Sequence, residues 1–415
     1  MNSRFGCQPG SVLTVEGGRA AASAVALEPA LQLVLLLTRL TLSVEQKRDA
    51  LTLCSRIDDW PRVAQEAEQR FVMPLVYRHL QQLAPKNLPP EQLEGMRCQC
   101  LAIVQYNLYL ADTQRQLVQE LLDPLGIPYL FFKGHALAAR YYDEPAMRFC
   151  RDIDLLVPHE RIVELLEVAL KQGYTPYWPR NLAPDRISLT FAARVRPVIT
   201  LQSPQGIPLE IHKQIDKAGT IYDTANLVGN AEALWVDDIE MSVMPTAELF
   251  VYACLHHTRH RWSHLHWLAD LDAIQRHPDF DLAAVRACAE QRNLTATLEA
   301  SLELYQACAM LEPWRNETIS DNGRALVEAC LINLQGGREA EVSLRSENPT
   351  PDFAFAWQTN LAHRLWWRIR GWVSLLQPSY ADYQSWPLRP SYQWLYLLTR
   401  PFRGLIKRLG SREAQ

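Results

Sequence analysis

Apolar residues change their spacing along this chain. Between residues 29 and 122 they recur every three or four positions, as in Val63, Ala67 and Phe71. That spacing is typical of amphipathic helices and predicts four or five of them. The same pattern returns between residues 246 and 334. Helices are therefore expected on both sides of a central segment that has a different texture.

The central segment carries short apolar runs bounded by turn residues, which predict buried strands. Stretches with helical spacing at 136–142 and 159–172 separate the first of these runs. Helices and strands alternate at first and strands dominate later, so the fold class expected is α+β, with a mixed sheet embedded in helical extensions. The runs lie at residues 127–132, 153–157, 174–178, 187–191, 198–201 and 209–212.

These patterns divide the chain into five parts. A polar stretch that opens at Gly336-Gly337 and runs to Pro351 reads as a linker. The expected parts are a flexible leader at 1–28, a helical lead-in at 29–125, a mixed α/β core at 126–240, a helical domain at 241–340, and a linker with a Trp-rich basic helical tail at 341–415.

Charge and composition exclude some classes of protein. The 415 residues include 42 Lys and Arg against 46 Asp and Glu, a net charge of −4, which is not the balance of a polybasic DNA-binding protein. The longest apolar run near the N-terminus, at 33–37, is far shorter than the ~20 residues of a membrane span. The nine cysteines show no paired framework. We expect reduced thiols and a cytoplasmic protein.

The net charge is divided unevenly. From residue 351 onward the chain has 9 basic and 3 acidic residues, a balance of +6, and six of the twelve tryptophans. The first 350 residues then carry −10. Such a tail packs on the core, contacts a protein partner or nucleic-acid bases, or associates with a membrane surface. The most amphipathic piece contains Phe402, Leu405, Ile406 and Leu409.

Acidic residues in two predicted strands suggest a metal site. Asp152 and Asp154 are two positions apart, so a strand would present both carboxylates on one face. Glu210 lies in another apolar strand and would bring a third. Buried carboxylates need a compensating charge, which two Mg²⁺ ions bound to a nucleoside triphosphate would supply.

Basic and glycine residues upstream suggest phosphate binding. Lys133-Gly134-His135 ends a strand, where a glycine lets backbone amides approach a phosphate and a lysine neutralises it. Arg148 either contacts phosphate as well or pairs with the nearby acids Asp143 and Glu144. His212 shares a strand face with Glu210, where it either contacts substrate or is a hydrogen-bonded histidine behind the site.

Five of the eleven histidines lie within eleven residues of one predicted helix: His256, His257, His260, His264 and His266. Of these, His256, His260 and His264 are spaced i, i+4 and i+8, so they would share a helix face and could bind zinc, as in a zinc hydrolase. No acidic residue stands between them as a metalloprotease helix requires. The alternatives are a helix that covers the cleft, with His257, Arg261 or Asp270 near substrate, or plain helix packing.

Together these motifs resemble the polymerase β-like nucleotidyltransferase superfamily, and more narrowly a bacterial branch of uncharacterised nucleotidyltransferases. The shared pattern is a Lys-Gly turn, an arginine, a D-I-D-L-L-V strand and an E-I-H strand, in that order. Asp59-Trp60, Met73-Pro74-Leu75 and Trp267-Leu268-Ala269-Asp270-Leu271 are also similar to that branch. The resemblance covers roughly residues 30–280.

The resemblance implies roles for individual residues. Asp152 and Asp154 would bind two Mg²⁺ ions, which Mn²⁺ can replace, and Glu210 would bind the catalytic ion and help activate an acceptor hydroxyl. Gly134 would lie against the triphosphate of ATP or another NTP. The acceptor is left open among a small molecule, a sugar, a peptide, a protein side chain and an RNA end. The alternative is a non-catalytic nucleotide-binding adaptor that docks through its Trp-rich tail.

Overall fold

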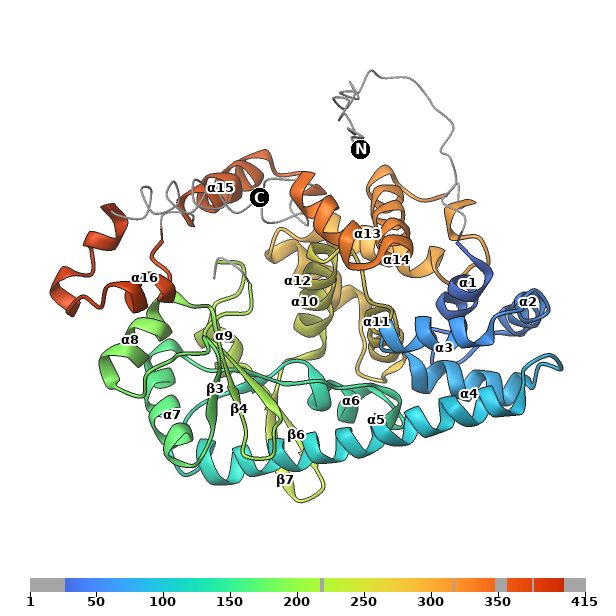
Figure 1. Cartoon of the computed structure of the whole chain (residues 1–415). Coiled ribbons are helices and arrows are strands. Elements are labelled where there is room, and N and C mark those ends of the chain that lie inside the picture. The colour runs from blue at the N-terminus through green and yellow to red at the C-terminus, as the bar shows by residue number, and fades with distance from the viewer. Residues whose placement is uncertain (1–26, 217–219, 316–317, 348–356, 375–376, 399–415) are drawn as a thin grey trace, which may run out of the picture.

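The computed structural model describes residues 27–216, 220–315, 318–347, 357–374 and 377–398. Almost all of the expected leader, and the amphipathic piece at 402–409, lie outside these residues. Within them the predicted α+β fold is confirmed, with helices surrounding a mixed sheet (Figure 1). None of the helices in these ranges is long and apolar enough to cross a membrane.

Helices occupy the first described part of the chain. Asp59 caps one of its helices by accepting a hydrogen bond from the Arg62 amide at 3.1 Å. The long helix α5 runs along the bottom of the molecule in Figure 1, from beneath the sheet to the bundle formed by α2, α3 and α4. The helices of this part are α1 (Pro29–Leu36), α2 (Val44–Cys54), α3 (Trp60–Gln69), α4 (Met73–Leu83) and α5 (Pro90–Leu117), which a π-helical turn (Val118–Leu122) extends.

Seven strands form one mixed sheet in the order β3-β4-β5-β2-β1-β7-β6. The pairs β2/β5 and β1/β7 are parallel, and the other neighbours are antiparallel. The strands are β1 (Leu130–Phe131), β2 (Ile153–Leu156), β3 (Thr175–Trp178), β4 (Val198–Gln202), β5 (Pro208–His212), β6 (Glu232–Val236) and β7 (Ile239–Val243).

The remaining helices lie between strands or follow the sheet. The first four are α6 (Gly134–Tyr141), α7 (His159–Lys171), α8 (Arg186–Val195) and α9 (Thr224–Gly229). Those after the sheet are α10 (Thr246–Arg259), α11 (His266–Arg276), α12 (Leu282–Gln291), α13 (Thr295–Ala307), α14 (Asp321–Glu347), α15 (Leu361–Ser374) and α16 (Tyr380–Ser385). Short 3-10 turns occur at Pro145–Met147, Pro313–Arg315 and Pro390–Tyr392.

The two faces of the central strands meet different cores. Ile153, Leu155 and Ile211 belong to a cluster with apolar residues of α5, α7 and α8. Leu156, on the other face of β2, belongs to a second cluster with the lead-in helices and α10 to α14. Because strand residues alternate between faces, Asp154 and Glu210 lie on the side of the second cluster.

One predicted strand is wrong. Residues 187–191 belong to helix α8, which begins after Asp185 accepts a hydrogen bond from the Ser188 amide at 2.9 Å. Leu189, Ala192 and Ala193 are buried at helical spacing. An N-cap followed by this i, i+3, i+4 pattern outweighs the β propensity of the short apolar run.

The β6–β7 hairpin was not predicted. Its turn is Asp237-Asp238, between the paired residues Val236 and Ile239, and Asp237 adopts a φ of 53°. Without glycine or asparagine the turn lacks the usual signal of a two-residue hairpin.

Two predictions after residue 255 are also wrong. The expected linker at Gly336-Gly337 is helical: α14 continues to Glu347 with a kink at Gly337, where φ is 59°. The histidine-rich segment is not one helix, because α10 ends at Arg259 and α11 begins at His266. Arg261 and Trp262 between them have φ values of 51° and 53°, and their left-handed backbone reverses the chain.

Candidate active site

Parallel pairing of β2 with β5 brings three polar side chains together. Asp154 is directly opposite Glu210, and Leu156 is opposite His212. His212 Nε2 lies 3.0 Å from Asp154 Oδ1 and 3.3 Å from Glu210 Oε2. One ligand atom from each of the three residues lies within 4.8 Å of the others. We call Asp154, Glu210 and His212 the strand cluster.

Lys133 and Asp152 adjoin the strand cluster. Lys133 Nζ lies 3.4 Å from Asp154 Oδ1. Burial alone would raise the pKa of Asp154, but Lys133 and His212 outweigh it and hold that pKa below its usual range. For Asp152, just before β2, the balance is reversed: burial and the charges of Asp154 and Glu210 outweigh Lys133 and Arg151 and raise its pKa to about 6.

The chemistry of this group fits a divalent cation. Three carboxylates crowd together, and Lys133 and His212 balance them only in part. Burial first, and then the negative charges of Asp154 and Glu210, raise the pKa of Asp152, and a bound cation would offset both effects. Carboxylate oxygens suit Mg²⁺ and Mn²⁺, and an imidazole nitrogen widens the choice among transition metals.

A glycine turn stands beside the carboxylates. Gly134 has a φ of 61°, and a Cβ at this position would lie 3.0 Å from the Asp152 carbonyl oxygen. It is the first residue of α6, which follows Lys133. Any side chain here would both strain the backbone and press against the loop that carries Asp152.

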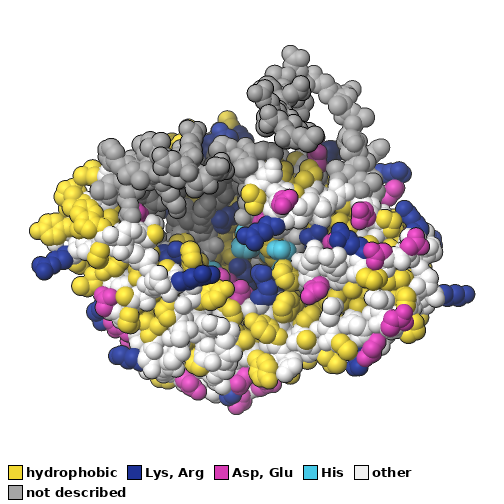
Figure 2. Space-filling view, in the orientation of Figure 1, with side chains coloured by type: hydrophobic (Ala, Val, Ile, Leu, Met, Phe, Trp, Pro, Cys, Tyr) yellow, Lys and Arg dark blue, Asp and Glu magenta, His cyan; other side chains and the backbone are white. Residues whose placement is uncertain are grey.

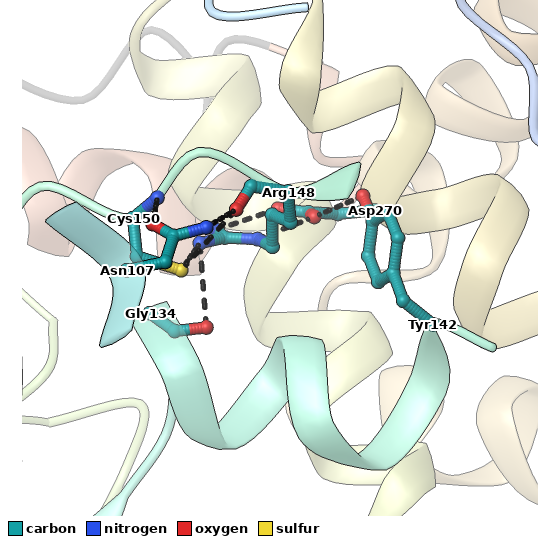
Figure 3. Close-up of polar contacts among 6 residues, drawn as sticks. All are labelled: Asn107, Gly134, Tyr142, Arg148, Cys150 and Asp270. Carbon is teal, nitrogen blue, oxygen red and sulfur yellow. Dashed lines mark hydrogen bonds and ion pairs between the residues drawn. The ribbon is translucent and has the colours of Figure 1, made fainter. Parts of the chain in front are cut away.

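Arg148 is buried in an ion pair that holds this turn in place (Figure 3). Its Nε and Nη2 donate to the two carboxylate oxygens of Asp270 at 2.7 and 2.9 Å, and its Nη1 donates to the Gly134 carbonyl at 3.3 Å. Tyr142 donates its hydroxyl to Asp270 at 2.8 Å. Burial works against the charge of Arg148, but Asp270 keeps its pKa well above the usual value. The ion-pair partner of Arg148 is thus Asp270, and neither Asp143 nor Glu144.

A pocket of about 260 Å³ opens over these residues. Figure 2 shows a hollow at the centre of this face, where histidines lie beside basic and acidic side chains. The lining residues are Phe132, Lys133, Gly134, Leu137, Arg148, Phe149, Arg151, Asp152, Asp154, Glu210, Leu249, Tyr252, Ala253, His256, His257, His260, His264, His266, Trp267 and Asp270.

Histidines form the wall opposite the strand cluster. The rings of His257 and Trp267 stack with centroids 4.6 Å apart and an interplanar angle of 9°. We call the five pocket histidines together with Trp267 the histidine wall. Burial holds the pKa values of His256, His257 and His266 well below their usual range. Burial and Arg151 lower the pKa of His264 to about 4. This wall is therefore largely uncharged at neutral pH.

Several of these histidines have buried ring nitrogens available to a ligand. Within the described residues, the Nδ1 atoms of His257, His264 and His266 are buried and have no hydrogen-bond partner. Buried polar atoms without partners are rare, and where they line a pocket they are suited to bind a ligand. Three imidazoles do not form a metal site here: the one such group found among the described residues is the strand cluster. The zinc interpretation fails because the predicted single helix does not exist.

Most of the residues predicted for the site meet at this pocket. Lys133, Gly134, Arg148, Asp152, Asp154, Glu210, His257 and Asp270 all line it. His135 and His212 do not line it, although His212 contacts two residues that do. Arg151, Tyr252 and Trp267 were not predicted. Arg151 adjoins the Asp-x-Asp motif, which could have suggested it, whereas Tyr252 gives no local signal in the sequence.

Comparison with known proteins points to one family. The family model described as uncharacterised nucleotidyltransferase matches residues 57–309. This range is more than half of the chain and contains the whole sheet, the glycine turn and the histidine wall. No curated protein matches the chain. The α14, α15 and α16 helices lie beyond the matched range.

Replacing Gly134 with alanine should destabilise the protein by about 1–2 kcal/mol, because alanine is strained at positive φ and its Cβ would press on the Asp152 carbonyl. Gly95, inside α5, has open space around it, so G95A should instead stabilise by up to about 1 kcal/mol. Urea unfolding measures both. Equal effects of the two substitutions would contradict the assigned geometry.

Removing either partner of the Arg148–Asp270 pair should cost about 3–5 kcal/mol, because the remaining charge is buried without compensation. The double variant R148M/D270L should lose clearly less than the sum of R148M and D270L. Chemical denaturation of all four proteins completes the cycle. Additive losses would show that the two side chains do not depend on each other.

The neutral histidines should make stability depend on pH. Their folded pKa values lie below the unfolded value of about 6.5, so the unfolded chain binds more protons as pH falls. Each such histidine should then remove up to about 1.4 kcal/mol of unfolding free energy per pH unit below about 6. Unfolding of wild type and H266N between pH 7.5 and 5.5 tests this. The slope should be smaller in H266N, and an unchanged slope would contradict the assignment.

Proposed function

The chain belongs to the uncharacterised nucleotidyltransferase family, and we propose that it transfers a nucleoside monophosphate from an NTP to a hydroxyl group with the help of a divalent cation. In this reaction the acceptor oxygen forms a bond to the α-phosphorus and the bond from that phosphorus to the bridging oxygen breaks. Pyrophosphate leaves, and the hydroxyl proton passes to a base. The observation that carries the proposal is the meeting of Asp152, Asp154 and Glu210 beside the Gly134 turn.

Asp152, Asp154 and Glu210 would hold the metal, with His212 Nε2 as a further donor or as the hydrogen-bond donor that orients Asp154 and Glu210. When bound, Mg²⁺ or Mn²⁺ neutralises charge on the triphosphate and stabilises the attacking and leaving oxygens. Glu210 is the most exposed member of the strand cluster, with 34 % of its side chain accessible, and faces the pocket. We assign it the role of accepting the acceptor's proton.

The triphosphate would lie against the turn that begins α6. Gly134 leaves the backbone open to close approach, and the first amides of α6 have no partner inside the helix. Lys133 supplies a positive charge at the same place. Arg148 is fully engaged by Asp270 and Gly134, so we assign it the positioning of the turn rather than direct phosphate contact.

The histidine wall would hold the rest of the reactants. The uncharged imidazoles of His257, His264 and His266, whose buried Nδ1 atoms have no hydrogen-bond partner among the described residues, suit neutral polar groups such as hydroxyls and amides. His257 lies on the pocket side, stacked on Trp267, and Asp270 acts through Arg148. The acceptor itself is drawn from small molecules, sugars, peptides, protein side chains and RNA ends.

A non-catalytic adaptor is the second candidate, and one contact favours it. Lys133 and His212 already engage Asp154, so the strand cluster is partly neutralised by the protein's own groups. A protein that only binds nucleotide could keep such a cluster without catalysing nucleotidyl transfer. Its Trp-rich tail would then serve as the docking surface.

Substituting Asp154 with asparagine should reduce transfer by about 10³-fold or more, because the central carboxylate of the strand cluster is lost. The assay supplies each α-³²P-labelled NTP with MgCl₂ and a panel of acceptors: glucose, a seryl peptide, a folded protein and an RNA oligonucleotide. Labelled product and released pyrophosphate are both measured. The matched control is D58N, since Asp58 is exposed and does not line the pocket.

Calorimetry with Mg-ATP separates the two candidates. An enzyme should bind Mg-ATP, release pyrophosphate with one of the acceptors, and lose that release in D154N while keeping its fold. Binding without any transfer would support the adaptor. Full transfer by D154N would overturn the assignment of the strand cluster.

A further inference from the structure

Helix α15 carries a stripe of large apolar side chains that face solvent. Leu361, Leu365, Ile369 and Trp372 are 68 %, 59 %, 55 % and 69 % exposed. Trp366 and Val373 extend the same face and are 44 % and 52 % exposed. At about 100° per residue these six positions cover an arc of roughly 140°. We call them the α15 stripe. Contiguous exposed patches of this kind mark interaction sites.

The opposite face of α15 is attached to the protein. Trp367 is 4 % exposed and belongs to the same apolar core as α10 to α14. Its indole nitrogen donates to His363 Nε2 at 3.0 Å. In Figure 1 the helix lies along the top of the molecule, far from α5 at the bottom. Trp367 therefore anchors the helix so that the α15 stripe points outward.

Positive charges border the α15 stripe. The helix contains Arg364, Arg368 and Arg370 and no acidic residue. On the same helical projection Arg368 falls at one border of the stripe and Arg370 at the other. Arg370 Cζ lies 5.1 Å above the ring of Trp366. Arginines on both borders of an apolar face can keep their charges at the level of lipid headgroups while their stems cover apolar surface.

Exposed aromatic residues continue after α15. Trp386, Tyr392 and Trp394 are 48 %, 55 % and 57 % exposed, and Leu397 and Leu398 are 50 % and 58 % exposed. Tryptophan and tyrosine are enriched where proteins meet the boundary between lipid and water. This segment and α15 lie outside the range matched by the family model, so nucleotide chemistry does not account for them.

From this pattern we infer that α15 lies flat on an anionic lipid surface, with its stripe at the boundary between headgroups and acyl chains. A basic, acid-free helix with leucine, isoleucine and tryptophan on one face is the composition expected of an interfacial helix. The arginine charges select anionic headgroups. The helix binds the surface and does not span it. This inference does not depend on the proposed reaction.

Co-sedimentation of the full-length protein with large vesicles tests the inference. We expect at least ten times more bound protein with vesicles of phosphatidylcholine and phosphatidylglycerol (7:3) than with phosphatidylcholine alone in 0.1 M NaCl. Raising the salt to 0.5 M should remove most of that difference, because screening weakens the arginine contribution. A blue shift of tryptophan fluorescence should accompany binding.

Two variants test the residues. L365E should lower vesicle binding at least tenfold by placing a charge within the α15 stripe. L108E is its matched control, because Leu108 is 66 % exposed on α5 and should tolerate the same substitution without losing binding. R368Q/R370Q should reduce the preference for anionic vesicles. Thermal unfolding of each variant confirms that the fold is kept.

Several outcomes would overturn the inference. One is equal sedimentation with and without vesicles, and another is equal loss of binding in L365E and L108E. A self-association that L365E abolishes, without vesicle binding, would identify the α15 stripe as a contact between copies. Vesicle binding that appears only after removal of residues 399–415 would show that this segment covers the stripe in the full chain.

Discussion

The buried ion pair of Arg148 with Asp270 determines how the two walls of the pocket face each other. Asp270 belongs to α11, beyond the histidine wall, whereas Arg148 precedes the Asp-x-Asp strand and binds the Gly134 carbonyl. The Arg148 carbonyl accepts from Asn107 of α5 at 2.8 Å. Three other segments of the chain thus meet at one residue, Arg148. Because a buried charge is tolerated only while it is paired, these segments cannot separate without a large cost.

The two sides of the pocket carry different side chains, with carboxylates on one side and uncharged histidines on the other. On the strand side, burial and the neighbouring carboxylates raise the pKa of Asp152. On the helix side, burial keeps His256, His257 and His266 uncharged. The pocket therefore concentrates negative charge near the glycine turn and offers uncharged hydrogen-bonding groups elsewhere. Such a division suits the proposed reaction, in which a divalent cation held by the carboxylates would meet the phosphates and the uncharged groups would orient the other reactant.

Local patterns predicted the strands that carry the strand cluster, and the order of the motifs suggested that these residues act together. Asp154 and Glu210 each lie between apolar neighbours in runs whose alternation defines a buried strand, so the strands and the shared face of Glu210 and His212 followed. The partner of Arg148 could not be predicted in this way, because Asp270 lies 122 positions away and two acids were closer in sequence. The end of the histidine-rich helix before Arg261-Trp262 could not be predicted either, since neither residue type favours a left-handed backbone. Packing around the buried Trp262, and not local preference, imposes it.

The parallel pairing of β1 with β7 has a consequence for the way the protein is made. Phe131 pairs with Val243, so during synthesis the inner edge of β1 stays open until the hairpin more than a hundred residues later has emerged. The Arg148 side chain likewise lacks its ion-pair partner until Asp270 has been synthesised. At roughly 5–20 residues per second this interval lasts on the order of 10 s. During this interval the nascent chain exposes an unpaired strand edge and the still unpaired charge of Arg148. A ribosome-associated chaperone would protect the chain at this stage.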